Sequence, residues 1–289
     1  ESSRGEGGKS LPVAIGAVTD EVARVHALNV LRHIFRDSVF NLSLFPLIGE
    51  AVKCACEGLK SNSWGVVNAS TMLFAALVQR VVGSKRVRDE HSSANGITSF
   101  EFFSRFPSLY SYFAEALAEA TEDMQIEKVV TADGAAGPQR LHPGLQPVLV
   151  LLSRLQPPPS EAVNDPYSIT AFYESIRKCS SLRQHHGRTM ASRALLCTIP
   201  GDQLQTKYEE ILRSIPTSVE ECLRTRTLNT VHGTLLQLEC IAREHPFRNT
   251  LKVTPSLAGL FVGVSYLQDT RVLDCPPVRA TFMEVCTAL

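Results

Sequence analysis

The stretch that decides the fold is Trp64-Gly-Val-Val-Asn-Ala-Ser-Thr-Met-Leu-Phe-Ala-Ala-Leu-Val-Gln-Arg-Val-Val82. It predicts one long helix that stops at Gly83, a residue type common just past a helix end. Trp64, Thr71 and Val78 are seven residues apart, which predicts that much of this helix faces neighbouring helices. We therefore interpret Asn68 as a buried amide that satisfies backbone groups between adjacent hairpins.

Helical patterns also dominate the rest of the chain. Apolar residues from Val22 to Phe35 recur at steps of three and four, which predicts an amphipathic helix with Thr19 as its N-cap. Strand-like runs occur only at 129–131 and 251–254, and both are too short to matter. We expect further helices at 46–57, 108–126, 144–156, 166–179, 188–199, 203–214, 229–244, 255–267 and 277–288.

Five of these helices share a pattern centred on a residue pair. The second members of the pairs are His26, Val67, Arg188, His232 and Arg279, at intervals of 41, 121, 44 and 47 residues. The long interval holds two units, with the helix at 144–156 as the missing member. A spacing of about 40–47 residues is typical of HEAT and armadillo repeats. The sequence therefore predicts an all-α fold, an armadillo/HEAT-like α-solenoid of stacked helical hairpins.

The predicted organisation is a disordered or linker tail over 1–18 followed by a single solenoid segment over 19–289. Two stretches rich in polar or small residues predict mobile loops at 83–99 and 127–144. The chain opens on Glu1 rather than Met in a low-complexity run. We expect it to be a piece of a much longer protein.

Composition excludes several classes of protein. Twenty-nine Lys and Arg balance twenty-nine Asp and Glu, which argues against an overall basic coat for nucleic acid. Charged residues at 20% and hydrophobic ones at 44% argue against a disordered chain. Eight scattered cysteines predict reduced, intracellular thiols. The uncharged run at 253–268 is short of the ~20 apolar residues of a membrane span, so we expect no membrane contact.

Catalytic and cofactor motifs are not found. No phosphate-binding glycine loop, zinc-protease motif, nucleophile elbow or paired CxxC occurs. The pair His185-His186 lacks companion ligands, so we expect neither a metal nor a cofactor. We interpret Asn229 as an N-cap and His232 as a satisfied polar group between repeats. An enzyme is the least favoured of three functional classes.

Two basic clusters stand out from the balanced charge. Residues 175–201 contain no Asp or Glu, and Arg80 leads into a second basic stretch. A role in binding RNA phosphates or an acidic partner is our hypothesis for both clusters. For Arg188 the favoured alternative is a structural ladder with an acidic partner. The candidate binding residues are Lys85, Arg86, Arg88, Arg177, Lys178, Arg183, Arg188 and Arg193.

Several of these segments resemble the thyroid adenoma-associated protein (THADA) family over about residues 20–245. The resemblance implies that Trp64, Asn68, Asn229 and His232 are family-motif residues with structural roles. An upstream Arg-Arg-Ser-Ala-Gly motif is absent, and Val67 stands where the family usually has arginine. The matching blocks are Arg24-Val-His-Ala-Leu-Asn-Val-Leu-Arg32, Trp64 to Phe74, Glu101-Phe-Phe-Ser-Arg-Phe-Pro-Ser-Leu-Tyr110, Leu141-His-Pro-Gly-Leu145, Leu151-Leu-Ser-Arg-Leu155, Arg188-Thr-Met-Ala-Ser-Arg-Ala194 and Asn229-Thr-Val-His-Gly-Thr-Leu-Leu-Gln237.

The resemblance implies a non-catalytic regulatory subunit of a cytoplasmic tRNA (32-2'-O)-methyltransferase complex. In that role the protein would help an FtsJ-type methyltransferase to modify the ribose of nucleotide 32 in the tRNA anticodon loop. Direct contact with the tRNA is one option within that role. The alternative is a general protein–protein scaffold of the armadillo/HEAT type without RNA contact. Salt-sensitive tRNA binding would favour the first function over the second.

Overall fold

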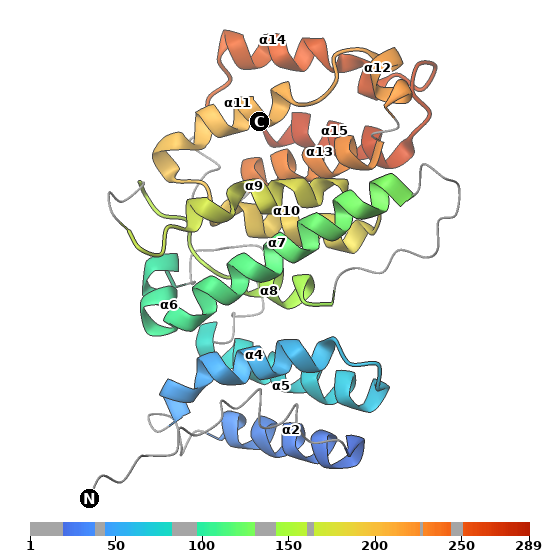
Figure 1. Ribbon diagram of the computed structural model, residues 1–289. Helices are drawn as coiled ribbons and strands as arrows, with labels where there is room; N and C mark the ends of the chain where they lie inside the picture. Colours follow the sequence, from blue (N-terminus) through green and yellow to red (C-terminus); the bar gives the residue numbers. More distant parts are fainter. Residues whose placement is uncertain are drawn as a thin grey trace, which may run out of the picture. The chain divides into compact units, whose positions relative to one another are not determined.

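A computed structural model of the chain describes residues 20–37, 44–82, 97–130, 143–160, 165–225, 228–243 and 251–289 (Figure 1). Every regular element in these ranges is a helix, apart from one isolated bridge between Thr98 and Gln156. This confirms the predicted all-α class. No helix in the described ranges has the length and apolar character needed to cross a bilayer.

The chain divides into two compact units. The first contains residues 1–84 and 106–112, and the second contains 85–105 and 113–289. Helix α7 supplies its first residues to the first unit and the rest to the second. The continuity of one solenoid over 19–289 stays a prediction, and the expected tail at 1–18 lies outside the described residues.

Figure 1 labels most of the helices. The first unit has α2 (Glu21–Arg36), η1 (Phe45–Leu47), α4 (Ile48–Leu59) and α5 (Trp64–Val82). Helix α6 (Ser99–Arg105) belongs to the second unit, and α7 (Pro107–Val130) is shared between the two. The remaining elements belong to the second unit. They are α8 (Leu145–Leu152), η4 (Ile169–Phe172), α9 (Tyr173–Lys178), η5 (Cys179–Ser181), α10 (His185–Leu196), η6 (Gly201–Gln203), α11 (Leu204–Arg213), α12 (Val219–Arg224), α13 (Leu228–Arg243), α14 (Pro255–Gly263), η8 (Ser265–Gln268) and α15 (Pro276–Ala288).

In the first unit, α5 packs against both α2 and α4. The Ser63 hydroxyl donates to Glu21 at 2.8 Å beside the start of both α2 and α5, and Arg80 donates to the Phe35 carbonyl at 2.6 Å near their ends. The two helices therefore run parallel, as the second helices of consecutive repeats do. The residues in these contacts are 42 and 45 positions apart, which matches the repeat spacing read from the sequence.

The buried face of α5 differs from the predicted one. Val66, Leu73 and Leu77 are fully buried at steps of seven and four, whereas Trp64 is 79% exposed. Asn68 is also exposed, so the prediction of a buried amide is wrong. The error arose because α5 carries apolar residues on more than one face, and periodicity alone does not say which face meets α2 and α4.

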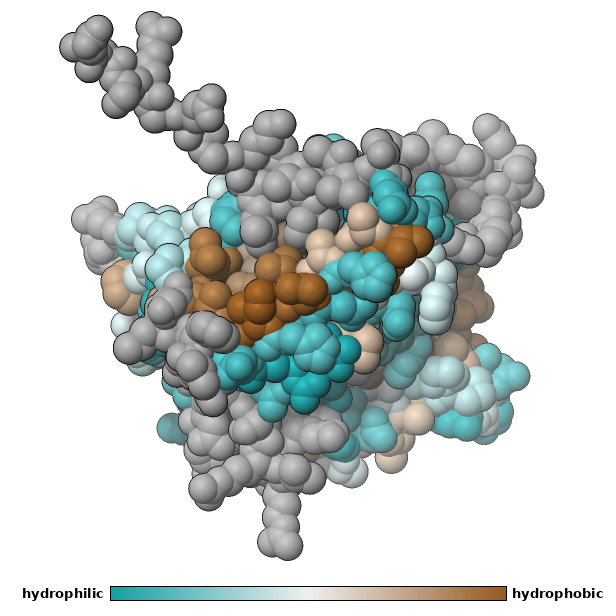
Figure 2. Space-filling view, turned by 90° about the horizontal axis from the view of Figure 1, so that it is seen from below, coloured by the Kyte–Doolittle hydropathy of each residue, from teal (hydrophilic) through white to brown (hydrophobic). Residues whose placement is uncertain are grey.

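The outward face of α2 carries a second apolar strip. Figure 2 shows the brown strip crossing the side of the molecule that bears this helix. Its most exposed members are Val22 at 62% and Val30 at 57%, while Leu28 and Phe35 on the opposite face are buried against α5. The helix begins at Asp20, whose carboxylate accepts from the Val22 amide. Asp20 therefore fills the N-cap position predicted for Thr19.

In the second unit, α10 packs against α8, α9 and α13, and α13 packs against α15 and α11. Of these helices, α10, α13 and α15 carry the repeated pair pattern, and α8 is the missing member. Gln205 on α11 bonds both the amide and the carbonyl of Lys252, 47 residues on, again one repeat away. The helices form stacked hairpins, and the predicted α-solenoid is confirmed.

Several predicted boundaries need correction. Residues 127–130, expected in a loop, continue α7, and Ser99 begins α6 rather than ending a loop. Two short helices, α6 and α12, were not predicted, because each has fewer than eight residues and too few turns to show a period. Residues 83–96 and 131–142, where both mobile loops were expected, lie outside the described residues.

Candidate functional site

The most polar contact between the helices of the second unit is centred on Arg188. Its guanidinium donates to the carbonyls of Leu182 and Arg183 at 2.6 and 2.8 Å, and to the side-chain oxygen of Asn229 at 3.2 Å. A further bond of 3.1 Å joins it to Nδ1 of His232. We call these groups the Arg188 network. It ties α10 to α13, because Arg188, Leu182 and Arg183 lie on α10 or just before it, whereas Asn229 and His232 lie on α13.

The Arg188 network requires a neutral histidine. Arginine can only donate, so Nδ1 of His232 accepts and the proton resides on Nε2. Burial of the ring, and then the charge of Arg188, lower the pKa of His232 from 6.5 to about 4. The ring of His185 stacks on it with centroids 5.5 Å apart. His232 is thus the satisfied polar group between repeats that the sequence predicted.

Arg188 is not available to a ligand. Only 6% of its surface is exposed, and its guanidinium is occupied inside the protein. These contacts are structural, as the alternative for this residue proposed, but the acidic partner expected in that alternative is replaced by carbonyls, an amide and a histidine. Asn229 lies inside the first turn of α13 and accepts from Arg188, so it does not have the predicted N-cap role.

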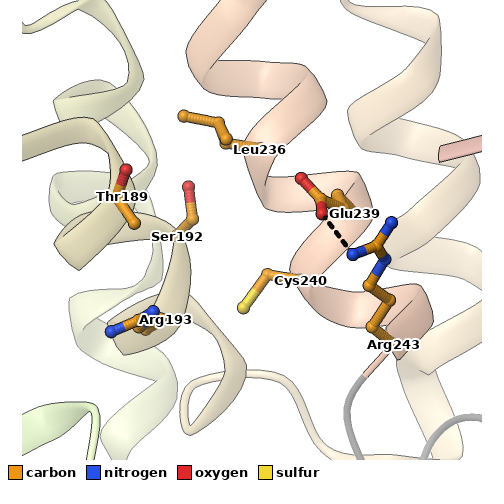
Figure 3. Close-up of a pocket in the computed structure, with 7 residues that line it drawn as sticks. All are labelled: Thr189, Ser192, Arg193, Leu236, Glu239, Cys240 and Arg243. Atoms are coloured by element: carbon orange, nitrogen blue, oxygen red, sulfur yellow. Dashed lines mark ion pairs between the residues drawn. The ribbon is translucent and has the colours of Figure 1, made fainter. Parts of the chain in front are cut away.

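Beside the Arg188 network, α10 and α13 border a pocket of about 170 Å³, which we call the α10–α13 groove. Figure 3 shows side chains from both helices converging on it, with the sulfur of Cys240 directed into the space between them. From α10 come Thr189, Ser192 and Arg193, and from α13 come Leu236, Glu239, Cys240 and Arg243. Positions 192 and 193 follow position 189 by three and four residues, which places all of them on one side of α10, and they therefore line one wall.

The α10–α13 groove carries a net positive charge. Arg243 pairs with Glu239 at 3.1 Å across one turn of α13, whereas Arg193 makes no hydrogen bond or ion pair with any residue in the described ranges. Burial, and then the charge of Glu284, raise the pKa of the Glu239 carboxyl. Two arginines outnumber the single carboxylate in the lining, and the groove therefore suits an anionic ligand.

The hydroxyl groups in the α10–α13 groove are already engaged. Thr189 donates to the His185 carbonyl at 3.1 Å, and Ser192 donates to the Arg188 carbonyl at 2.8 Å, both within α10. Neither is paired with a base that could activate it. Among the described residues, these two hydroxyl groups therefore serve the helix backbone, and the groove offers ionic and apolar contacts.

The other predicted binding residues have different surroundings. Arg177 is half-buried and lies 3.7 Å from the carboxylate of Glu210, so it has an acidic partner of its own. Lys178 and Arg183 are exposed near the start of α10. Lys85, Arg86 and Arg88 lie outside the described residues. Of the eight candidates, the structure therefore brings one, Arg193, into the α10–α13 groove.

Sequence reasoning missed Glu239 and Arg243. Their spacing of four on α13 is that of an ordinary solvated ion pair on a helix surface. The neighbouring Glu284 lies on α15, 45 positions further along the chain, and no local signal connects it to them. In the described ranges no group of three or more metal-ligating side chains is found.

Comparisons with known proteins identify two family matches. The family described as "Trm732, C-terminal TPR repeats" matches residues 68–241, and "THADA/TRM732, DUF2428" matches residues 11–65. The spacing of 41 to 47 residues seen in the inter-repeat contacts exceeds the about 34 of tetratricopeptide repeats and is that of HEAT or armadillo units.

Similar proteins are named as regulators of a tRNA (32-2'-O)-methyltransferase. The human protein THADA is 36% identical over 231 residues, or 78% of this chain, and the chicken THADA is 31% identical over 273 residues, or 93%. The regulator trm732 of Schizosaccharomyces pombe is 27% identical over 224 residues, or 76%. The matched stretch covers 11% to 14% of these relatives. No solved structure matches.

Proposed function

Because the chain belongs to the THADA/Trm732 family, we propose that it serves as part of a non-catalytic regulatory subunit of a tRNA (32-2'-O)-methyltransferase. The relatives at 31% to 37% identity are named as regulators of that enzyme. The partner in this proposal is an FtsJ-type 2'-O-ribose methyltransferase, the substrate is the ribose of tRNA nucleotide 32, and the compartment is the cytoplasm.

The observation that carries the proposal is the α10–α13 groove. Arginine suits phosphate because its planar guanidinium can donate two parallel hydrogen bonds to one oxyanion. Arg193 has no competing partner in the described ranges, and Arg243 uses part of its guanidinium on Glu239. We infer that the groove holds a phosphate of the tRNA backbone.

The Arg188 network supports this role indirectly. By fixing α10 to α13, it sets the width of the α10–α13 groove and keeps Thr189 and Arg193 opposite α13. A rigid wall reduces the conformational entropy lost when a ligand binds. Lys178 and Arg183, exposed near the start of α10, would extend the positive surface beyond the groove.

The test measures binding of a tRNA anticodon-arm hairpin to the 289-residue chain at several salt concentrations. Arg193→Glu combined with Arg243→Glu should remove up to two phosphate contacts and lower the slope of log affinity against log salt by about 1–2. Arg213→Glu is a matched control: Arg213 is 50% exposed and pairs with Glu209 four residues earlier, as Arg243, 51% exposed, pairs with Glu239. Arg213 lies on α11, away from the groove.

An unchanged slope in the double variant would exclude the groove as a phosphate site. The competing function, a protein scaffold without RNA contact, predicts no salt-dependent RNA binding by the native chain but capture of the methyltransferase through the same arginines. Ribose methylation of tRNA in cells that lack the full-length protein tests the regulatory role itself. Undiminished methylation at nucleotide 32 would contradict the proposal.

A further inference from the structure

The exposed face of α5 carries a line of side chains that the core does not use. Trp64, Asn68 and Met72 follow one another at steps of four residues, which places them on one side of the helix. In the repeat alignment that pairs Val67 with Arg188, Asn68 and Met72 correspond to two residues that line the α10–α13 groove, Thr189 and Arg193. The line therefore occupies, in its own repeat, the helix positions that border the α10–α13 groove in the repeat of α10.

Trp64 is unusual for its exposure. The indole is 79% accessible, and it has no ring contact with any described residue. Large aromatic side chains are usually buried, because each can bury about 150–250 Å² of surface. The surface beside it is partly polar. Asn68 in the line and Thr71 next to it are exposed as well, and no described residue hydrogen-bonds the amide of Asn68. An isolated ring beside a free amide fits a small planar polar ligand better than a broad apolar protein surface.

A cationic group lies beside the line, and helix α5 itself contains no Asp or Glu. From α2, the guanidinium of Arg32 reaches across to the sulfur of Met72 at 3.5 Å. The acid at the Trp64 end is Glu21, whose carboxylate accepts the Ser63 hydroxyl at 2.8 Å.

We propose that the face of α5 formed by Trp64, Asn68 and Met72 binds single-stranded RNA, with the Trp64 indole stacked on an unpaired base. Asn68, one turn along, hydrogen-bonds an edge of that base or of the next nucleotide, and Arg32 contacts the adjacent phosphate. Stacking of unpaired bases on aromatic rings is a common way to hold single-stranded RNA. This inference rests on the proposed function, because it names the part of the tRNA, an unpaired loop, that α5 contacts.

Trp64 is the chain's sole tryptophan, so its fluorescence reports on this site directly. The chain is titrated with an anticodon-arm hairpin and, separately, with a fully paired RNA duplex of equal length. A stacked base should quench the emission and protect the indole from acrylamide with the hairpin, and much less with the duplex. Affinity is measured in parallel from the anisotropy of end-labelled RNA, which does not depend on Trp64.

Substitutions separate stacking from a structural role. Trp64→Ala should weaken hairpin binding by about five- to a hundredfold, and Trp64→Phe should restore most of it. Asn68→Ala should weaken it by a smaller factor. Phe100→Ala is the matched control, because Phe100 is also an exposed aromatic, at 56%, on α6. It should leave affinity unchanged, and all variants should keep the native melting temperature.

The two proposals fail in different ways. If RNA binds with the expected salt dependence but neither quenches nor protects Trp64, the base-stacking inference is wrong and the phosphate groove stands. If no RNA binds at all, both fail. Protection of the indole by the purified methyltransferase, without any effect of RNA, would assign this face of α5 to a protein partner and overturn the inference.

Discussion

Replacing Gly233 by alanine should destabilise the second unit, although alanine is the better helix former. Gly233 lies inside α13, where alanine is favoured over glycine by about 0.5–1 kcal/mol. A Cβ at this position would lie 2.2 Å from the carbonyl oxygen of Ser180 and 2.7 Å from its Cα. These are backbone atoms, and no rotamer change can relieve the overlap. Helix α13 must therefore move away from η5 by more than an ångström.

That displacement has a calculable cost. Forcing an extra carbon into a packed interface costs about 1–3 kcal/mol. The same displacement would stretch the bonds from Arg188 to His232 and Asn229, now 3.1 and 3.2 Å, and an under-bonded buried group costs about 1–3 kcal/mol. After subtraction of the helix-propensity gain, we expect a loss of about 2–4 kcal/mol in the free energy of unfolding.

Urea denaturation followed by far-ultraviolet circular dichroism measures this loss, with Gly259→Ala as the control. Gly259 also lies inside a helix, α14, but a Cβ there would meet nothing within 4 Å. The control should be as stable as the native chain or up to about 1 kcal/mol more stable. If Gly233→Ala behaved like Gly259→Ala, the close approach of α13 to Ser180 would be refuted.

Three further predictions concern the same unit and the thiols. The pKa of His232 is lowered to about 4 in the folded chain, so the unfolded state binds a proton first as the pH falls below 6.5. The free energy of unfolding should therefore decrease by up to about 3 kcal/mol between pH 7 and pH 4. Urea midpoints measured at several pH values should show this decrease in the native chain and a smaller one in His232→Gln. Arg188→Met should lower the free energy of unfolding by about 2–4 kcal/mol, because it leaves buried carbonyls and His232 without a donor. The control Arg183→Met, at an exposed position, should change it by less than about 0.5 kcal/mol. Equal effects of the two variants in thermal unfolding would contradict the Arg188 network. Alkylation of the native chain, followed by mass spectrometry, should modify the exposed Cys286 first, and early labelling of the buried thiols would contradict the packing. The buried thiols are those of Cys222 and of Cys54, Cys56, Cys179 and Cys197, and burial raises the pKa of the last four.

The candidate site was only partly accessible from the sequence. The absence of acidic residues over 175–201 drew attention to Arg193, which lines the α10–α13 groove. The same signal selected Arg188, which is buried. The distribution of charge along the chain does not show whether an arginine faces solvent or is buried, because one helix turn contains positions of both kinds. The opposite wall of the groove, with Glu239 and Arg243, gave no signal at all.

The sequence by itself determined the helices, their repeat spacing and the family. These properties are encoded locally: a helix shows its period within a dozen residues, and a repeat shows itself as a similar pattern 41 to 47 positions later. Tertiary structure alone decided which face of each helix is buried. Trp64 is exposed although its spacing predicted contact with neighbouring helices, and Arg188, named among the candidate binding residues, is buried. A helix with apolar or basic residues on two faces shows which face is buried only through its neighbours, and those neighbours lie a whole repeat away in the chain.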